Sequence, residues 1–520
     1  MTESSAPTDA LPSAAATPAP TRTFETLVIA GIMLSLLMGA LDQFVVLTAL
    51  PTILAELGQP SSGTFVVTAY IIASTVAIPI FGKLSDLWSR RNVFLGGLAV
   101  FIVGSMLAGL SQSLPELIVF RAVQGFGSGG FFPVGIAIVG VSFPPATRAR
   151  ITGLLSGVFG IATVAGPLLG STILDHTTWR WVFYVNLPVG LVGATVLLKA
   201  LGPLKPERAR RFDLLGAGLL VGWVGALEYA LIQVSDSGWS WTDPRVLGLL
   251  GTAAAVAVGF VLWELYRAPE PLVPLRLLAK RVVGVSGATT FLIGAVFLPL
   301  ATFVSLVVGL ALTPPGASSA DIVRDVLYAL VLPLVFGAAL GGQLITRLPY
   351  RVLVLLGAGI AILGMAFLRG ITASTPTWVL ADGFLPVGGV VLPLIPLGFG
   401  IGMTFPVFVL AVQNSVRTED FGEASGLIQF LQQLGGSIGL SVFASYALSR
   451  LSALDPLPSA ACETAQGPTI PACLPYLEAF PRSEVAAYDL TFTVMLGLLV
   501  AAAGVALFLK GRYLKSPAPP

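Results

Sequence analysis

Long apolar stretches separated by short polar segments follow one another along almost the whole chain. There are about fourteen, each near the twenty residues that an α-helix needs to cross a bilayer. They lie near 26–49, 64–83, 93–111, 116–141, 151–174, 180–200, 213–234, 246–266, 283–311, 322–345, 351–370, 387–413, 424–450 and 487–510. The pattern predicts an all-α membrane protein with about fourteen transmembrane helices.

The composition supports lipid as the main solvent of this chain. Hydrophobic residues make up 55% of the 520 residues and charged residues only 10%, with a mean hydropathy of +0.90. A soluble domain carries about a quarter charged residues. A net charge of +2 gives no basic patch for nucleic acid. Because the chain has no phosphate-binding loop and no His, Cys or Ser cluster for catalysis, we expect neither an enzyme nor a cofactor or metal.

The basic residues indicate an orientation. Most of the 28 lysine and arginine residues fall in alternate polar segments, those on the same side as the N-terminus. Basic residues favour the cytoplasmic side of a membrane. We therefore expect a protein of the plasma or inner membrane with both termini in the cytoplasm. Residues 1–22, rich in Ala, Pro, Ser and Thr, and residues 513–520 are predicted cytoplasmic tails, the first of them disordered.

The sequence repeats itself at a long interval. Residues 125–133 read GFGSGGFFP and residues 398–406 read GFGIGMTFP, 273 positions later. Residues 82–91 and 342–351 form a looser pair, 260 positions apart. Internal repeats of this kind are typical of secondary transporters. We therefore predict two pseudo-symmetric six-helix bundles, 23–205 and 282–512, around an inserted helix pair with its linkers, 206–281.

The two cysteines, Cys462 and Cys473, both fall in a polar segment, 451–486, that the orientation places outside the cell. A local disulfide is one interpretation, because disulfides persist in oxidising compartments. Two free thiols in a loop is the other.

The predicted spans place Asp42, Arg121 and, on the inserted pair, Glu228 well inside the membrane. Asp42 is about 12 Å and Arg121 about 8 Å from the outer ends of the first and fourth spans, at about 1.5 Å per residue. A charge inside the membrane is costly and by default marks function. Asp42 could instead be a structural hydrogen-bonding acid, and Arg121 could extend to the outer surface.

Several motifs together resemble the major facilitator superfamily, in particular its fourteen-helix drug/proton antiporter branch. They are Gly82-Lys83-Leu84-Ser85-Asp86 with Arg90-Arg91, Leu41-Asp42-Gln43, Arg121-Ala122-Val123-Gln124-Gly125, Gly157 with Gly166-Pro167-Leu168-Leu169-Gly170, residues 179–188, and residues 422–437. The resemblance covers nearly the whole chain after the tail.

The resemblance implies a role for each motif. Asp42 and Arg121 would couple transport to protons. Gly82, Asp86, Arg90 and Arg91 would form a conformational gate, and Gly157, Gly166, Pro167 and Gly170 the antiporter helix motif. Glutamine side chains on spanning helices are candidates for the substrate cavity, namely Gln43, Gln124, Gln429, Gln432 and Gln433.

The expected function is therefore proton-coupled export of small hydrophobic or amphipathic compounds by alternating access, by a monomer in the lipid bilayer. A lipid or lipid-conjugate translocator is an alternative, as are uptake and a membrane sensor or scaffold, because a fold does not fix a function.

Overall fold

A computed structural model describes residues 22–57, 64–201, 212–235, 239–306, 319–369, 390–454 and 474–509. Within these ranges all regular structure is helical, and twelve helices are long and apolar enough to cross a membrane. The coarse prediction of an all-α membrane protein thus agrees with the structure, whereas the count of fourteen and the insertion of a helix pair stay predictions.

The N-terminal half follows the predicted spans with two breaks. Its helices are α1 (Arg22–Leu57), α2 (Thr64–Leu87), α3 (Arg90–Leu110), α4 (Leu114–Ser128), α5 (Phe131–Ser142), α6 (Pro145–His176), α7 (Trp181–Tyr184) and α8 (Asn186–Ala200). The predicted span 116–141 is divided between α4 and α5 at Gly129 and Gly130. Adjacent glycines favour such a break, because glycine has a low helix propensity.

The rest of the chain continues with α9 (Leu214–Ser235), α10 (Pro244–Tyr266), α11 (Leu275–Leu278), α12 (Arg281–Leu306), α13 (Ser319–Leu344), α14 (Tyr350–Leu368), α15 (Val391–Gln413), the 3₁₀ turn η3 (Thr418–Asp420), α16 (Phe421–Leu454) and α18 (Leu474–Ala506). Two helices extend into the predicted loop 451–486: α16 ends at Leu454, and α18 begins at Leu474, where Leu, Ala and Glu residues favour a helix.

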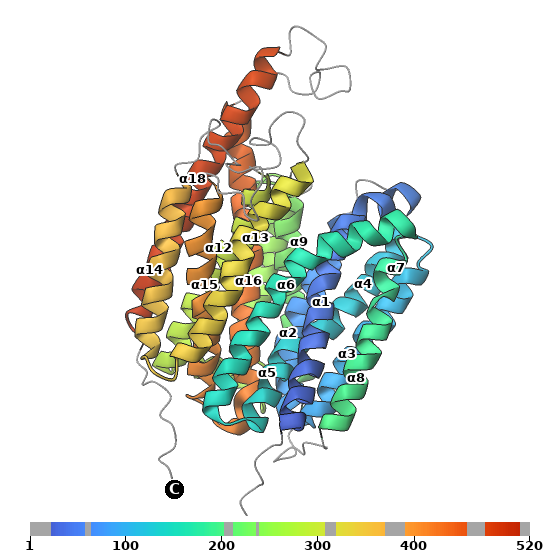
Figure 1. The fold of residues 1–520 in the computed structure, drawn as a ribbon, viewed down its shortest axis with the longest axis vertical. Helices are drawn as coiled ribbons and strands as arrows, with labels where there is room; N and C mark the ends of the chain where they lie inside the picture. Colours follow the sequence, from blue (N-terminus) through green and yellow to red (C-terminus); the bar gives the residue numbers. More distant parts are fainter. Residues whose placement is uncertain are drawn as a thin grey trace, which may run out of the picture.

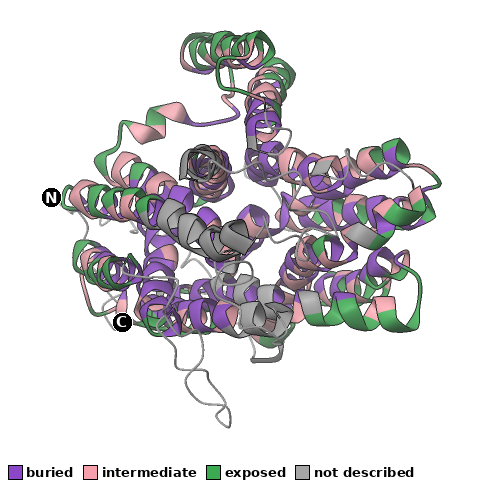
Figure 2. Ribbon diagram, turned by 90° about the horizontal axis from the view of Figure 1, so that it is seen from above, coloured by how far each residue is buried: buried purple, intermediate pink, exposed green. Residues whose placement is uncertain are grey.

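Apolar side chains cover the outside of the bundle as well as its interior. Seen along the helices, buried residues gather inside and exposed residues lie on the perimeter (Figure 2). Large hydrophobic side chains such as Leu191, Val258, Phe336 and Phe367 are more than half exposed. An apolar perimeter of this extent fits hydrocarbon rather than water.

Helix packing repeats at the same two intervals as the sequence motifs. Gly125 of α4 lies against the Tyr70 carbonyl of α2, and Gly398 of α15 lies against the Leu330 carbonyl of α13. The two glycines are 273 positions apart and their two partners 260 apart. Because a side chain larger than hydrogen would meet backbone at these points, glycine permits the close approach.

The two halves meet at one end of the bundle, which we call the N-terminal side: α1 begins there and α2 ends there (Figure 1). Gly82 at the end of α2 lies against Gly422 at the start of α16. Gly342 near the end of α13 lies against Ala149 near the start of α6. These contacts, related by the same two intervals, close the N-terminal side.

Candidate functional site

Asp42 and Arg121 form a buried ion pair between α1 and α4. Arg121 Nη1 lies 2.5 Å from Asp42 Oδ2, and both side chains are at most 1% exposed. The Arg121 Nε also donates to the Val66 carbonyl at 3.3 Å. The structure therefore brings together the two residues that the sequence singled out, and it excludes extension of Arg121 to the surface.

Neutral polar groups complete the surroundings of the carboxylate. Gln124 Nε2 and Asn186 Nδ2 donate to Asp42 Oδ1 at 2.8 and 2.9 Å. Both amides also donate to Ser105 Oγ, whose hydroxyl donates to the Phe183 carbonyl at 2.8 Å. Ionised Asp42 thus accepts three hydrogen bonds from three donor groups, which offsets part of the cost of burying its charge.

The polar cluster contains residues that the sequence did not reveal as site residues. Asn186 occupies the first position of α8 and Ser105 lies on α3. An asparagine among apolar residues is a signal that could have identified Asn186, whereas Ser105 resembles any other serine that bonds within a membrane helix. Gln124, predicted to line the cavity, is fully buried in this cluster instead. Gln124 lies one helical turn from Arg121, and its Oε1 accepts a hydrogen bond from Arg121 Nη1 at 2.7 Å. This hydrogen bond turns the amide nitrogen of Gln124 toward Asp42.

A cavity of about 160 Å³ lies between the two halves. Aromatic and aliphatic side chains form most of its wall, and its polar groups are all uncharged. The wall consists of Gln43, Phe44, Phe132, Thr290, Gly294, Phe297, Leu298, Val331, Leu334, Phe405, Phe408, Val409, Ile428, Gln429, Gln432, Gln433 and Gly436. The hydroxyl of Thr290 has no hydrogen-bond partner within the described residues. Of the five glutamines predicted for the cavity, all but Gln124 lie here.

Tyr70 separates this cavity from the ion pair. A second hollow of about 70 Å³ shares Gln43, Phe132, Gln429 and Gln433 with the cavity and extends to Tyr70. The guanidinium of Arg121 lies 4.2 Å from the centre of the Tyr70 ring, within the range of a cation–π contact. The Tyr70 hydroxyl donates to the Gly39 carbonyl of α1 at 3.1 Å. Tyr70 thus borders the hollow and also contacts the buried guanidinium.

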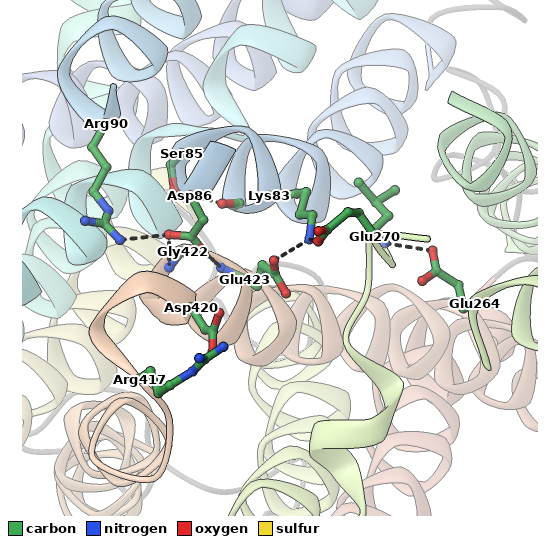
Figure 3. Close-up of polar contacts among 12 residues, drawn as sticks. Lys83, Ser85, Asp86, Arg90, Glu264, Glu270, Arg417, Asp420, Gly422 and Glu423 are labelled. Carbon is green, nitrogen blue, oxygen red and sulfur yellow. Dashed lines mark hydrogen bonds and ion pairs between the residues drawn. The ribbon is translucent and has the colours of Figure 1, made fainter. Parts of the chain in front are cut away.

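Asp86 joins the two halves on the N-terminal side. Its carboxylate accepts the backbone N–H groups of Gly422 and Glu423, at 3.0 and 2.7 Å, in the first turn of α16 (Figure 3). A carboxylate at a helix N-terminus is favoured by the unsatisfied N–H groups and the helix dipole. Arg90 donates both to Asp86 and to the Thr418 carbonyl, each at 2.9 Å. The N-terminal half therefore caps a helix of the other half.

Lys83 provides a second polar link at the same place. Its ammonium lies 2.5 Å from Glu423 of α16 and 3.5 Å from Glu270, which lies between α10 and α11 (Figure 3). The Glu270 segment is held in turn by Glu264 of α10, which accepts the Leu272 N–H at 3.1 Å. We call the contacts of Gly82, Lys83 and Asp86 with α16, and of Arg90 with Thr418 in η3, the inner gate, because the sequence predicts that this side faces the cytoplasm.

Arg91, predicted as part of the gate, lies elsewhere. Its guanidinium donates to the Leu201 carbonyl at 2.7 Å, just after α8 and within its own half. The correction follows from helix geometry, because consecutive residues on a helix point about 100° apart, so that Arg90 and Arg91 cannot both face α16.

The glycines of the predicted antiporter motif lie along α6 at two helix contacts. A Cβ on Gly157 would be 2.8 Å from Val335 of α13, and one on Gly170 would be 2.9 Å from Thr48 of α1. Gly166 packs on Phe44, which also lines the cavity. Pro167 lies in the same helix. Cys462 and Cys473, the predicted disulfide, lie outside the described residues.

A surface ion pair closes the opposite end of the N-terminal half. Glu56 of α1 accepts from Arg180 at 2.6 Å and from the Trp179 indole at 2.8 Å, and these hydrogen bonds, that of Arg180 first, lower the pKa of the Glu56 carboxyl. The pair therefore stabilises the fold at neutral pH and ceases to do so as the pH falls through the lowered pKa. Because Glu56 is half exposed, Glu56→Gln should change the free energy of unfolding by less than ~1 kcal/mol. Thermal unfolding in detergent at pH 7 and pH 4 measures this, and a larger loss at pH 4 than at pH 7 would contradict it.

Comparison with known proteins decides the family. Residues 32–440 match the Major Facilitator Superfamily. The chain belongs to this superfamily. Its members are transporters, and the chain is accordingly a multi-pass membrane transporter of the Major Facilitator Superfamily.

Several relatives are named for resistance or export. Multidrug resistance protein 3 of Bacillus subtilis (strain 168) is 31% identical over 417 residues, 80% of this chain and 78% of that protein. The tetracenomycin C resistance and export protein of Streptomyces glaucescens is 32% identical over 511 residues, 92% of this chain and 90% of that protein.

Solved structures of the superfamily share the fold. The proton:xylose symporter XylE bound to 6-bromo-6-deoxy-D-glucose has a TM-score of 0.60 at 14% identity and covers 94% of this chain and 96% of its own. The transporter FucP in the outward conformation has a TM-score of 0.55 at 13% identity, covering 92% of this chain and 99% of its own. At such identities the likeness concerns the fold alone.

Proposed function

We propose that this transporter is a proton-coupled antiporter, of the fourteen-helix drug/proton branch, that exports uncharged hydrophobic or amphipathic compounds from the cytoplasm. The observation that carries the proposal is the buried Asp42–Arg121 pair directly behind the substrate cavity: Gln43 is the next residue after Asp42 and belongs to the cavity wall. The names of the relatives support drug export as the direction and purpose of transport.

The charges suggest the order of events. In the present conformation Asp42 is paired with Arg121, and protonating it would leave Arg121 as an uncompensated buried cation. Proton uptake by Asp42 therefore requires Arg121 to find another partner, which demands movement of α4 against α1. With the N-terminal side cytoplasmic, the inner gate is closed here. A proton that enters from outside would loosen the pair, favour opening of the inner gate and be released when substrate has bound.

The wall of the cavity supports the substrate class. Its polar groups are four glutamine side chains and one threonine hydroxyl, and the rest is apolar. Neutral amides and a free hydroxyl can orient polar groups of a ligand, whereas an organic cation would be buried here without a counter-charge. The same wall would accept acyl chains, which keeps a lipid translocator as the second candidate.

Transport into proteoliposomes tests the proposal. Purified protein is reconstituted in liposomes with an acidic lumen, and uptake of radiolabelled chloramphenicol and other uncharged drugs is compared with uptake of ethidium. We expect an uncharged drug to accumulate in the lumen, acidification outside to accompany its uptake, and nigericin to abolish both. Ethidium should not accumulate. Uptake that is unaffected by nigericin would refute proton coupling, and movement of fluorescent phospholipids with no drug uptake would favour the lipid translocator.

A further inference from the structure

A second acidic side chain is buried in the membrane-spanning part, away from the site described above. Glu228 of α9 is 1% exposed, and its Oε1 lies 2.6 Å from the Ser437 hydroxyl of α16. Helix α9 packs against α16, α2 and α10. Trp223 and Tyr229 of α9 contact Phe430 of α16 and Phe65 of α2 through their rings, which fixes α9 against both halves.

Among the described side chains, no cation is paired with this carboxyl group. Arg450 of α16 is the thirteenth residue after Ser437, about 20 Å farther along the helix at about 1.5 Å per residue. The other charged and titratable side chains on the helices around Glu228 are Tyr70, Lys83 and Asp86 on α2, Arg245, Glu264 and Tyr266 on α10, Glu423 and Tyr446 on α16, and Tyr229 on α9 itself. Within the described part of the chain, none of them forms an ion pair or a hydrogen bond with Glu228. An ionised carboxylate in hydrocarbon with one neutral donor is costly.

The hydrogen bonds around Ser437 are compatible with a proton on Glu228. The single hydroxyl proton of Ser437 faces three acceptors: Glu228 at 2.6 Å and the carbonyls of Gln433 and Leu434 at 3.2 and 3.4 Å. If Glu228 is protonated, it donates to Ser437 Oγ, and Ser437 donates to the Gln433 carbonyl. If Glu228 is ionised, Ser437 donates to it and leaves that carbonyl. The charge on Glu228 thus sets the direction of the Ser437 hydrogen bond.

This hydrogen bond ends on the wall of the substrate cavity. Gln433 and Gly436 belong to the wall, and Ser437 is the next residue on α16. A ligand that contacts this turn changes the position of Gln433 and Ser437 relative to Glu228. The Ser437 hydroxyl therefore connects Glu228, on a helix predicted to belong to the inserted pair, with the wall of the cavity.

We propose that Glu228 is a second proton-binding residue of the transport cycle, linked through Ser437 to the cavity wall at Gln433. The proposal rests on the proposed proton-coupled function and adds to it: Glu228 binds a proton when the cavity is empty and releases it when substrate occupies the turn of Gln433. Each uncharged molecule exported is then exchanged for one proton more than Asp42 alone would carry.

The stoichiometry of exchange tests this. In proteoliposomes loaded with radiolabelled chloramphenicol, or whichever uncharged drug the protein transports, the steady drug gradient is measured against imposed pH gradients and membrane potentials. Glu228→Gln should transport the drug with one proton fewer per molecule than wild type. Glu116→Gln, an exposed acid on α4, is the control and should keep the wild-type ratio. If wild type is proton-coupled and Glu228→Gln exchanges the same number of protons per drug molecule, the proposal for Glu228 is overturned and the proposed function stands. If wild type shows no proton coupling, the proposed function is overturned as well.

A spectroscopic measurement can also be made on variants that transport little drug. Infrared difference spectra on adding the drug should show loss of protonated carboxyl C=O absorption from both Asp42 and Glu228 in wild type. The part that belongs to Glu228 should be missing in Glu228→Gln and shifted in Ser437→Ala, which removes the hydrogen-bond partner and keeps the acid. Identical carboxyl bands in wild type and Glu228→Gln, or no shift of any band in Ser437→Ala, would contradict the assignment.

Discussion

Replacing Asp42 with asparagine is expected to abolish proton-driven transport and to destabilise the protein. Arg121 is paired with Asp42 at 2.5 Å in a fully buried site, and the neutral amide leaves the guanidinium without a counter-charge. Removing one partner of a buried pair costs about 3–5 kcal/mol. Export of an uncharged drug against its gradient, measured in proteoliposomes, should fall to the level of empty liposomes, and thermal unfolding in detergent should occur at a lower temperature.

A double substitution separates these two effects. Asp42→Asn with Arg121→Gln removes both charges, so that it should recover part of the stability that Asp42→Asn loses. It should not recover transport, because the Asp42–Arg121 pair, whose protonation drives the change of conformation, is then absent. Glu56→Gln on the same helix is the matched control, since Glu56 is a surface acid paired with Arg180. A stable Asp42→Asn protein that still exports drug with the wild-type proton dependence would refute the role of Asp42.

Substituting leucine for Gly82 is expected to prevent the inner gate from closing. A Cβ at Gly82 would lie 2.7 Å from the Gly422 carbonyl oxygen, so that α2 and α16 cannot keep their distance. Overpacking of this kind costs about 1–3 kcal/mol. Because about 1.4 kcal/mol is a tenfold change in an equilibrium constant, the ratio of closed to open molecules should fall roughly 5- to 150-fold.

Cysteine labelling measures this shift. Thr290, in the cavity wall, is replaced by cysteine after Cys462 and Cys473 have been changed to serine, and inside-out vesicles are treated with an impermeant maleimide. Gly82→Leu should raise the labelling rate at least about fivefold over its parent, because the rate follows the fraction of open molecules. Gly96→Leu on α3 is the control, because no atom lies within 4 Å of its added Cβ. Equal labelling of all three proteins would show that Gly82 does not hold the gate.

The broad architecture could be predicted from the sequence, because lipid imposes a simple rule on it. A backbone in hydrocarbon must satisfy its own hydrogen bonds, so that each apolar stretch of about twenty residues becomes a helix. The internal repeat could also be predicted from the sequence. Gly125 and Gly398, 273 positions apart, both occur where helices touch. The cost of a charge in lipid likewise singled out Asp42 and Arg121 without any structure.

Contacts between distant helices were decided by the tertiary structure alone. An asparagine among apolar residues marks Asn186 as unusual, but it does not identify Asp42 as its partner. Ser105 carries no signal at all, because a small polar residue in a membrane helix can equally well bond to its own backbone. The placement of Gln124 in the ion-pair cluster, of Arg91 away from the gate, and of Ser437 opposite Glu228 depends on how helices rotate and pack. The rotation of a helix about its axis is set by neighbours far away in the chain. When a helix is apolar on all sides, its sequence does not indicate which face points toward which neighbour.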